Sequence, residues 1–500
     1  MGFPLRIFRQ FIPVAAFSLI ISLILYDKNE KGKQKVQKGR SAGQRMVVNM
    51  KDDTVTSGSI WSGIWQMSWP LLAIMILNFF VGLADVYVAG MISPDIQATV
   101  GFVTQIYFFI IIVANAMGIG TLSLAAREIG AGNPDSAVAI AKQAMFAGLV
   151  TAAALTVITF MLSREIIALI GLPPSIRESA SKFLMIFSLS LGPNYALIIS
   201  NALFRAGGDV RRPLLTMFVV SIINIAGDFL LVFGAHPFSG MGYQGIAVAT
   251  SISVTGGLIV NLFLLRRSRW QKIYEGAWTL SREIAGRIMR VAWPAAVLQI
   301  AWGAGTIVLY AILGKLGDAS IVSMAALANG LRIEAAIYLP AFALNMAAAV
   351  LVGQNLGAGK PERAASAGWR ITVSGVLLVS LMSLAVFISA EGLSAMFTGN
   401  AEVLKETVRY LRLNMLSEPF MAISAILGGG LQGAGDTRGT MWAIIISMWL
   451  IRLPLAYTLS VVLGYGAAGV WIAMVASMAV QGSLMALRFH RGRWKLATAD

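Results

Sequence analysis

Two aspartates stand far inside long apolar stretches of the chain. Asp85 lies 15 positions after Pro70, and Asp228 lies 15 positions after Pro213. An ionised side chain at the centre of a membrane costs at least about 2.5–3.5 kcal/mol, so residues of this kind are candidates for function. In a helix, 15 residues cover about 22 Å. The equal spacing therefore predicts that the two carboxyl groups reach the same depth in a membrane.

Two further polar side chains are expected beside this pair. Asn224 precedes Asp228 by one helical turn and shares its face, and Thr250 enters another apolar stretch at a compatible depth. Neighbouring carboxylates raise each other's affinity for a proton, so one of them would bind and release a proton near neutral pH. The same oxygens are suited to Na⁺. The alternative interpretation is that each aspartate only caps or hydrogen-bonds a bent helix.

Composition indicates that such stretches cross a membrane many times. Of the 500 residues, 57% are hydrophobic and 12% are charged, whereas a soluble domain carries roughly 25% charge. Apolar stretches of about 20 residues recur along the chain. We therefore expect an all-α polytopic membrane protein with twelve transmembrane helices, at about 62–90, 97–127, 138–162, 180–205, 213–235, 244–266, 287–314, 320–353, 367–389, 404–432, 440–462 and 466–488.

The predicted spans fall into two halves of six, because short motifs recur about 225 residues apart. The recurring pairs are Trp69-Pro70 with Trp293-Pro294, the Gly-Ala-Gly loops at 130–132 and 357–359, and the Gly-Asp-x-Arg turns at 208–211 and 435–438. An even number of spans gives both halves one orientation, so the repeat is parallel. We expect two pseudo-symmetric six-helix bundles, an N-lobe over 60–268 and a C-lobe over 269–490, followed by a cytoplasmic tail over 491–500.

Lysine and arginine are concentrated in alternate loops. They follow the second, fourth, sixth, eighth and tenth predicted spans and recur in the C-terminal tail. The positive-inside rule then places both ends of the twelve-helix unit in the cytoplasm, at the plasma membrane. The net charge of +16 therefore indicates the orientation of the chain in the membrane. Membrane lipids are the expected partners of the basic loops. No basic soluble face is evident, so we expect no nucleic-acid partner.

Residues 1–59 stand outside both halves. They hold an apolar run of 16 residues at 11–26 and a Lys-rich linker at 28–51. The run is short for a span of about 20 residues. We favour a natural start near Met50, with the preceding segment absent from the native protein; an extra N-terminal helix is the competing interpretation. A cleaved signal peptide is disfavoured because no small-residue cleavage site follows.

The second half carries other ionisable groups within its spans. Glu334 follows Arg332 by two positions, Glu418 precedes Pro419, and Arg452 lies deep in the eleventh predicted span. We expect Glu334, Glu418 and Arg452, together with Asn201, to line a substrate cleft. A structural ion pair between Arg452 and one of the glutamates is an equal alternative. Pro70 is the expected hinge of the first span.

Several chemistries are excluded by missing residues and motifs. The chain has no cysteine, which rules out disulfides and thiolate metal sites, and we expect neither of its two histidines to bind a metal. It has no Gly-x-x-x-x-Gly-Lys-Ser/Thr loop, no His-Glu-x-x-His motif and no nucleophile elbow. We therefore expect neither an ATP-driven pump nor an enzyme, and no cofactor besides a coupling ion.

The paired motifs together resemble the multidrug and toxic compound extrusion transporters over about residues 60–490. Asp85, Asn224, Asp228 and Thr250 coincide with the first-lobe cation pocket of the bacterial DinF-like branch. The resemblance implies two six-helix bundles around a central cleft, in the bacterial inner membrane. It also implies export of organic cations driven by H⁺ or Na⁺ antiport. The second-lobe acid that the other branch carries in span seven is not evident here, because Leu309 stands opposite Asp85 in the repeat.

We therefore expect a monomeric secondary active transporter that is coupled through Asp85 and Asp228, with H⁺ and Na⁺ both open as the coupling ion. A flippase for lipid-linked precursors or polysaccharides is the alternative within transport, and it would require a basic cleft. A non-transporting membrane receptor or scaffold is the alternative of another class. Loss of either aspartate would leave the binding of such a receptor intact.

Overall fold

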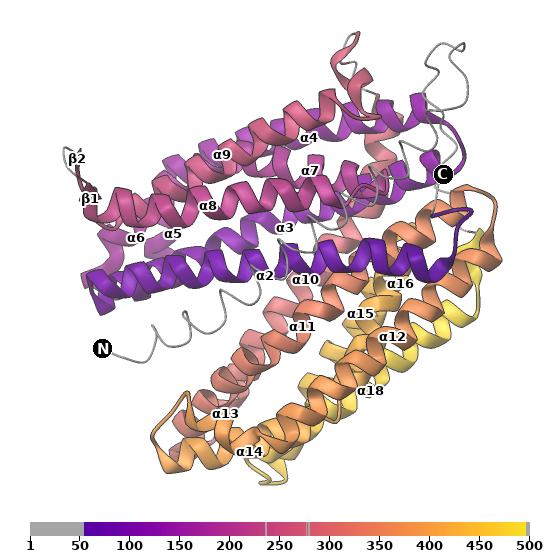
Figure 1. The fold of residues 1–500 in the computed structure, drawn as a ribbon. Helices are drawn as coiled ribbons and strands as arrows, with labels where there is room; N and C mark the ends of the chain where they lie inside the picture. The colour runs from indigo at the N-terminus through magenta and orange to yellow at the C-terminus, as the bar shows by residue number, and fades with distance from the viewer. Residues whose placement is uncertain (1–54, 236–237, 277, 279–280, 497–500) are drawn as a thin grey trace, which may run out of the picture. The chain divides into compact units, whose positions relative to one another are not determined.

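The computed structural model describes residues 55–235, 238–276, 278 and 281–496, and nearly all of them are helical. The expectations for residues 1–54, including the apolar run and the start near Met50, lie outside the described residues. The described chain confirms an all-α polytopic membrane protein. Its helices form two groups that follow the two halves of the sequence (Figure 1).

The first lobe contains eight helices and a small hairpin. Strands β1 (Gly234–Ala235) and β2 (Phe238–Ser239) pair antiparallel between the last two of these helices, and the one-turn helix η1 (Gln271–Tyr274) leads to the second lobe. The helices are α2 (Ile60–Ile92), α3 (Pro94–Gly130), α4 (Pro134–Met161), α5 (Ser163–Ile170), α6 (Pro174–Ser188), α7 (Leu191–Ala206), α8 (Arg211–Phe233) and α9 (Gln244–Arg266).

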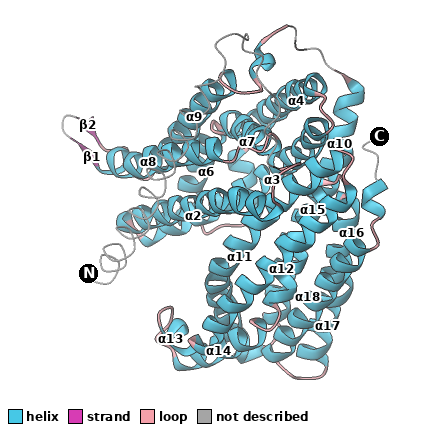
Figure 2. Ribbon diagram, turned by 45° about the vertical axis from the view of Figure 1, so that its right-hand side comes forward, coloured by secondary structure: helices cyan, strands magenta, loops and turns pink. Residues whose placement is uncertain are grey.

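The second lobe repeats this plan from residue 282 onward. Its elements are α10 (Arg282–Leu313), η2 (Gly317–Ala319), α11 (Ser320–Gly357), α12 (Pro361–Ile388), α13 (Ala390–Ala395), α14 (Ala401–Asn414), α15 (Glu418–Gly433), α16 (Thr437–Ile445), η3 (Ile446–Arg452), α17 (Leu453–Tyr457), η4 (Thr458–Val462), α18 (Ala467–His490) and η5 (Arg493–Leu496). Figure 2 shows that helices dominate both lobes.

Two of the twelve predicted spans are broken rather than continuous. Within the part of the chain that the structure describes, ten helices are long and apolar enough to cross a membrane, and α6 with α7, bent by 50°, gives an eleventh. The remaining span, predicted at 404–432, is divided into α14 and α15 over residues 415–417. Pro193 and Pro419 lie within the first three residues of α7 and α15. Proline lacks the N–H that would continue the preceding helix, which explains why a new helix starts at each of these two positions.

The eleventh span is also irregular. Its residues Ile446–Arg452 and Thr458–Val462 are wound as π-helix, on either side of the short α17. Wider turns of this kind are rare and occur frequently at functional sites. They set the side chain of Arg452 at the end of the first π segment, two positions before Pro454. The local winding therefore decides where this buried cation points.

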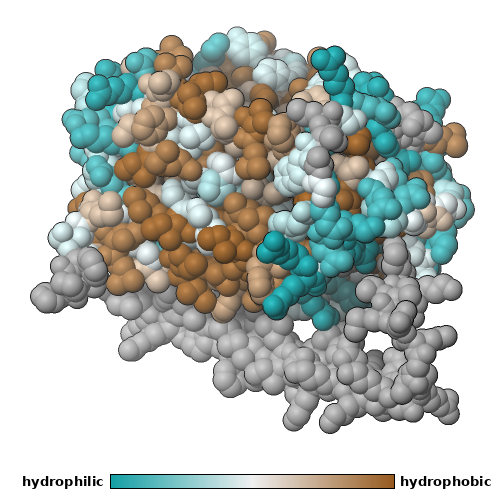
Figure 3. All heavy atoms as spheres, turned by 90° about the horizontal axis from the view of Figure 1, so that it is seen from above, coloured by the Kyte–Doolittle hydropathy of each residue, from teal (hydrophilic) through white to brown (hydrophobic). Residues whose placement is uncertain are grey.

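The outer face of the second lobe matches a lipid environment. On α12, Leu377, Leu381 and Leu384 follow a helical spacing and are 62%, 68% and 55% exposed. Lipid tails provide the apolar surroundings that water would not, so such a stripe is stable only within a membrane. Figure 3 shows apolar residues across the middle of one face of the described chain, between more polar residues at its sides.

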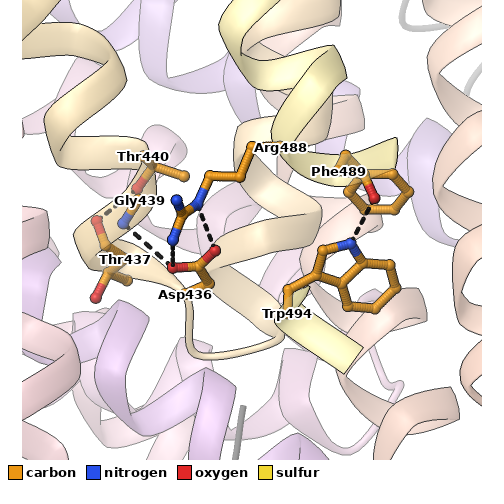
Figure 4. Close-up of polar contacts among 7 residues, drawn as sticks. All are labelled: Asp436, Thr437, Gly439, Thr440, Arg488, Phe489 and Trp494. Atoms are coloured by element: carbon orange, nitrogen blue, oxygen red, sulfur yellow. Dashed lines mark hydrogen bonds and ion pairs between the residues drawn. The ribbon is translucent and has the colours of Figure 1, made fainter. Parts of the chain in front are cut away.

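The repeated Gly-Asp-x-Arg turns are helix caps. In the second lobe, Asp436 Oδ1 accepts the Gly439 N–H at 3.2 Å, and the same carboxylate binds Arg488 through two hydrogen bonds of 2.6 and 2.7 Å (Figure 4). In the first lobe, Asp209 accepts the Arg212 N–H at 3.4 Å and pairs with its guanidinium at 3.2 Å. The charges of these motifs thus fix the starts of α8 and α16.

The long helices α3 and α11, which occupy equivalent places in the repeat, join the lobes at their C-terminal ends. A Cβ at Gly130 would collide with the carbonyl oxygen of Gln354, and a Cβ at Gly357 would collide with that of Arg127. The pairs Gly130–Gly357 and Arg127–Gln354 are each 227 positions apart. The contact is therefore reciprocal about the pseudo-two-fold axis of the repeat, and glycine is required on both sides. We call these four residues the glycine gate.

Hydrogen bonds between the lobes support the same region. Ser123 Oγ donates to Gly433 O at 3.1 Å, and Gln354 Nε2 donates to Ala206 O at 2.6 Å. Lys360 Nζ donates to Thr56 O at 2.9 Å, which ties the segment before α2 to the second lobe. The lobes are accordingly in contact at the end that carries the basic loops.

Replacing Gly130 by alanine should disturb this contact. Over-packing of a closed interface costs about 1–3 kcal/mol, so we expect Gly130→Ala to lower the Tm of the purified protein. Gly101→Ala is the matched control, because Gly101 lies in the same helix and no heavy atom stands within 4 Å of its added Cβ. The control should leave the Tm unchanged or raise it slightly. Equal changes of Tm in the two variants would contradict the requirement for glycine at the contact between the lobes.

Candidate functional site

The structure brings the two first-lobe aspartates together. Helices α2 and α8 pack side by side, and α9 covers α8. The Asp85 carboxyl group is close enough to Asp228 and Asn224 to interact with both. The two aspartates for which equal spacing predicted one depth are thus neighbours in the folded chain. We call Asp85, Asn224, Asp228 and Thr250 the acid site.

The acid site has more acceptors than donors. Asp228 and Asn224 are 0% exposed. The Asn224 amide donates to Thr250 Oγ1 at 3.2 Å, and the Thr250 hydroxyl donates to the Ile246 carbonyl at 3.1 Å. Both oxygens of Asp228, Oδ1 of Asp85 and Oδ1 of Asn224 are buried without a hydrogen-bond partner among the described residues. Four buried acceptors without a donor are costly, and a proton or a cation among them would lower that cost.

A proton or a Na⁺ ion would fit this set of oxygen atoms. A proton on one carboxyl group would convert it into a donor for its neighbour and remove the repulsion between the two charges. Carboxylate, amide and hydroxyl oxygens are also the ligands that hard cations prefer. Among the described residues, no group of three or more His, Cys, Asp or Glu side chains is placed to hold a metal ion.

Helix α2 carries Asp85 and runs without interruption through Pro70. The proline is buried, and the helix is continuous from Ile60 to Ile92. Proline removes one backbone hydrogen bond from such a helix and makes that point easier to bend. The assignment of Pro70 as the hinge remains a prediction.

The second-lobe groups also converge, in a separate buried cluster. Glu334, Glu418 and Arg452 are 1%, 2% and 4% exposed. The Tyr338 hydroxyl donates to Glu334 Oε2 at 3.2 Å, and the buried Tyr410 hydroxyl lies near Glu334 without a hydrogen-bond partner among the described residues. Oε1 of Glu334 and Oε2 of Glu418 have no hydrogen-bond partner within the described chain. We call Glu334, Tyr338, Tyr410, Glu418 and Arg452 the second-lobe cluster.

The arginine of this cluster does not form a direct ion pair. Its Nε donates to Ser477 Oγ at 2.7 Å, and its guanidinium lies 5.2 Å from the centre of the Trp302 ring. Arg452 influences Glu334 and Glu418 through the field of its charge, and no ion pair joins it to either residue among the described side chains. The direct ion pair offered by the sequence as an alternative is therefore not formed.

Asn201 does not join the other predicted cleft residues. It accepts a hydrogen bond of 2.9 Å from Asn261, which also binds Ser200 at 2.7 Å and Thr216 at 2.6 Å. These residues form a polar cluster between α7, α8 and α9 within the first lobe. The hydrogen bonds of Asn201 therefore run within the first lobe and not to Glu334, Glu418 or Arg452, and its place in a substrate cleft stays a prediction.

Sequence reasoning missed one charged group between the lobes. Arg205 is the last residue of the fourth predicted span, beside a basic loop, and it lies in the last turn of α7. Its Nη1 stands 2.8 Å from Met346 Sδ of the second lobe, and its Nε is buried with no hydrogen-bond partner among the described residues. The available signal was the repeat, which places the neutral Gln432 at the equivalent position, 227 residues later.

Comparison with known proteins matches this architecture. The model of the MatE family matches twice, over residues 70–230 and 294–458, once in each half. The chain is 27% identical over 438 residues to a probable multidrug resistance protein NorM of Thermotoga maritima, covering 86% of this chain and 92% of the relative. Other relatives at similar identity carry the same name. The assignment to the DinF-like branch stays a prediction.

Solved structures show the same fold. A MOP superfamily transporter from Pyrococcus furiosus superposes with a TM-score of 0.79 at 20% identity, over 91% of this chain and 100% of that chain. A multidrug resistance MATE family transporter in an outward-facing conformation gives a TM-score of 0.77 at 21% identity, over 89% and 99%. At this sequence identity, the structural similarity supports the twelve-helix fold alone.

The family match settles the class of the protein, because it covers more than half of the chain and falls on both repeats. A receptor, a scaffold and a membrane enzyme are thereby set aside. The described helices supply the apolar spans of an integral membrane protein. The chain belongs to the MatE family, the multidrug and toxic compound extrusion transporters, and not to a family of enzymes.

Proposed function

We propose that the protein exports organic cations from the bacterial cytoplasm by antiport with H⁺ or Na⁺, coupled at the acid site. The observation that carries this proposal is the set of four buried acceptor oxygens without a partner in the first lobe. The repeat places Leu309 and Leu455 opposite Asp85 and Asp228, so the second lobe lacks this site. Relatives named as multidrug resistance proteins support the substrate class.

The proposed cycle links the acid site to the glycine gate. In the state described here the lobes touch at the end with the basic loops, which the positive-inside rule assigns to the cytoplasm. A coupling ion that enters the acid site from outside removes its excess negative charge. Helix α2, which carries Asp85 and also packs against α11 of the other lobe, would then repack or bend at Pro70. The affinity of the outward-open state for the drug then falls, and the lobes rock to the inward-facing state.

Neutralising either aspartate should abolish coupling. In vesicles that contain the purified protein, we expect Asp85→Asn and Asp228→Asn to reduce the efflux of a fluorescent organic cation at least about tenfold under an imposed pH or Na⁺ gradient. An amide cannot take up the proton, and it binds Na⁺ more weakly than a carboxylate does. The wild type should respond to one of the two gradients, which identifies the coupling ion.

Asp95→Asn is the matched control for this experiment. Asp95 is exposed in the first turn of α3, outside the acid site, and the substitution removes the same charge. We expect its efflux to equal that of the wild type. Undiminished ion-driven efflux by Asp85→Asn would show that coupling does not pass through the acid site.

We further propose that the second-lobe cluster is held together by charge balance. Two carboxyl groups and one guanidinium share a site that is closed to solvent in this conformation. A bulky organic cation cannot reach these side chains while they are buried, so a direct substrate contact requires another conformation. Removing the single cation would leave two buried acids without compensation, a change that typically costs about 3–5 kcal/mol.

Arg452→Gln should therefore destabilise the protein strongly, with a lower Tm and a lower yield of folded protein. The double variant Arg452→Gln/Glu418→Gln should recover a large part of the loss, because it removes one of the uncompensated carboxyl groups. Additive losses in the double variant would contradict charge balance and favour independent roles for the two residues. Thermal unfolding of the purified variants in one detergent measures both effects.

A further inference from the structure

An apolar stripe on the surface of α9 ends at two arginines. Ile252, Ile259 and Phe263 follow a helical spacing and are 51%, 62% and 52% exposed. Arg266 is the last residue of α9 and Arg267 caps it, three and four positions after Phe263. Residues at this spacing share one face of a helix. Because the stripe is stable only against lipid tails, the two arginines lie where the lipid headgroups begin.

Each of these arginines lies over an aromatic ring. The guanidinium of Arg267 is 4.2 Å from the centre of the Phe263 ring, and that of Arg266 is 5.2 Å from the centre of the Tyr274 ring. The Tyr274 hydroxyl donates to the Leu262 carbonyl at 2.7 Å, which holds this ring against α9. A guanidinium over a ring face keeps N–H donors at its edge for another acceptor. The two charges are thus positioned without being neutralised.

The start of α8 lies at the same edge of the membrane. Helices α8 and α9 pack side by side (Figure 1), and Arg212 Nη2 donates to the carbonyl oxygen of Arg267 at 3.1 Å. Arg211 precedes Leu215, which is 50% exposed, by one helical turn. Ile222, two turns further along, is 53% exposed. The lipid-facing surfaces of both helices therefore end at arginines on the side of the basic loops.

Carboxylates do not balance the charge at the end of α9. Asp209 pairs with Arg212 at 3.2 Å, and Asp135 pairs with Lys272 at 2.7 Å. Among the described residues, three neighbouring guanidinium groups have no carboxylate within ion-pair distance, those of Arg266, Arg267 and Arg269. This edge of the first lobe therefore carries an excess of positive charge next to an apolar surface.

We propose that the end of α9 binds the headgroup of an anionic phospholipid, with Arg266 and Arg267 as ligands of its phosphate and the apolar stripe against its acyl chains. We call Phe263, Arg266, Arg267 and Tyr274 the headgroup site. The N–H groups of a guanidinium match the oxygens of a phosphate. Tyr274 and Trp278 are 38% and 39% exposed, as is typical of aromatic side chains at headgroup level. The proposal assigns a partner outside the transport pathway and does not depend on the proposed export function.

The second lobe provides an internal comparison. The glycine pairs at the starts of α9 and α18 are 224 positions apart, so Arg491 is equivalent to Arg267 and Leu487 to Phe263. Arg491 is exposed like its counterpart, but a leucine replaces the ring beneath it. A headgroup site that depends on the stacked guanidinium should therefore exist in the first lobe and not at the equivalent place in the second.

Native mass spectrometry of the purified full-length protein tests this site. The delipidated protein in detergent would be titrated with dioleoylphosphatidylglycerol, which is anionic, or with dioleoylphosphatidylcholine, which is zwitterionic. The Kd of the first bound lipid is read from the fraction of protein that carries it. We expect the wild type to prefer phosphatidylglycerol, and Arg267→Gln to raise the Kd of that lipid about fivefold. The Kd of phosphatidylcholine should change less than about twofold, because its net charge is zero.

Two matched variants separate a built site from a general effect of charge. Arg491→Gln removes the same charge from the equivalent position, and it should change the Kd of phosphatidylglycerol less than about twofold. Phe263→Leu introduces the residue of the second lobe and changes no charge. It should raise this Kd about two- to threefold, because the guanidinium loses the ring that positions it. All three positions are exposed, so the variants should fold and keep the Tm of the lipid-free wild type.

The headgroup site is overturned if the wild type binds the two lipids equally well. Equal effects of Arg267→Gln and Arg491→Gln would also overturn it, because the lipid would then respond to net charge alone. An unchanged Kd in Phe263→Leu would contradict the stacked geometry on which the site depends. None of these measurements involves transport, so a failure of ion-driven export in vesicles is a separate result.

Discussion

A buried acceptor oxygen without a donor is costly in a membrane, where no bulk water can replace the missing hydrogen bond. The acid site collects four such oxygens on α2 and α8, two helices that pack directly against each other. The site is therefore stable only when a proton or a cation joins it, or when the helices move apart enough to admit water. Under the proposed function, this dependence would let an ion control the position of α2, and the contacts of that helix with the second lobe would transmit the change to the glycine gate.

The two halves of the chain share the arrangement of their helices but differ in their buried ionisable side chains. Their symmetric part includes the caps at Asp209 and Asp436 and the reciprocal contact of Gly130 and Gly357. These features stabilise the contact between the lobes and the starts of α8 and α16. The asymmetric part consists of side chains that have an apolar or neutral residue at the equivalent position. Asp85 and Asp228 are the examples, and both belong to the acid site.

Much of this arrangement follows from the sequence. Apolar stretches predicted the helices, and the recurring motifs predicted two lobes because a parallel repeat needs an even number of spans in each half. The equal distances from Pro70 and Pro213 predicted that Asp85 and Asp228 meet, since a helix rises by a constant amount per residue. Family resemblance then assigned a role to the pair, and that role still awaits experiment.

Other features depended on tertiary packing that no local pattern reveals. The breaks before α7 and α15 arise from prolines, yet a proline inside α2, α10 or α11 leaves those helices continuous. The polar cluster of Asn201 with Asn261 depends on which helices meet, and residue spacing does not show this. The position of Arg205 at the end of a predicted span likewise gives no sign of a contact with the other lobe. Only the packing of α7 against the other lobe shows that its guanidinium faces a cavity.

The central claim is that one ion and the drug are linked through the acid site, and an equilibrium measurement tests it most directly. The Kd of a fluorescent organic cation for the purified protein would be measured across pH without Na⁺, and across Na⁺ concentration at constant pH. We predict that the Kd of the wild type rises with the concentration of one of the two ions, and that this dependence disappears in Asp85→Asn. An ion dependence that persists unchanged in Asp85→Asn would contradict the account.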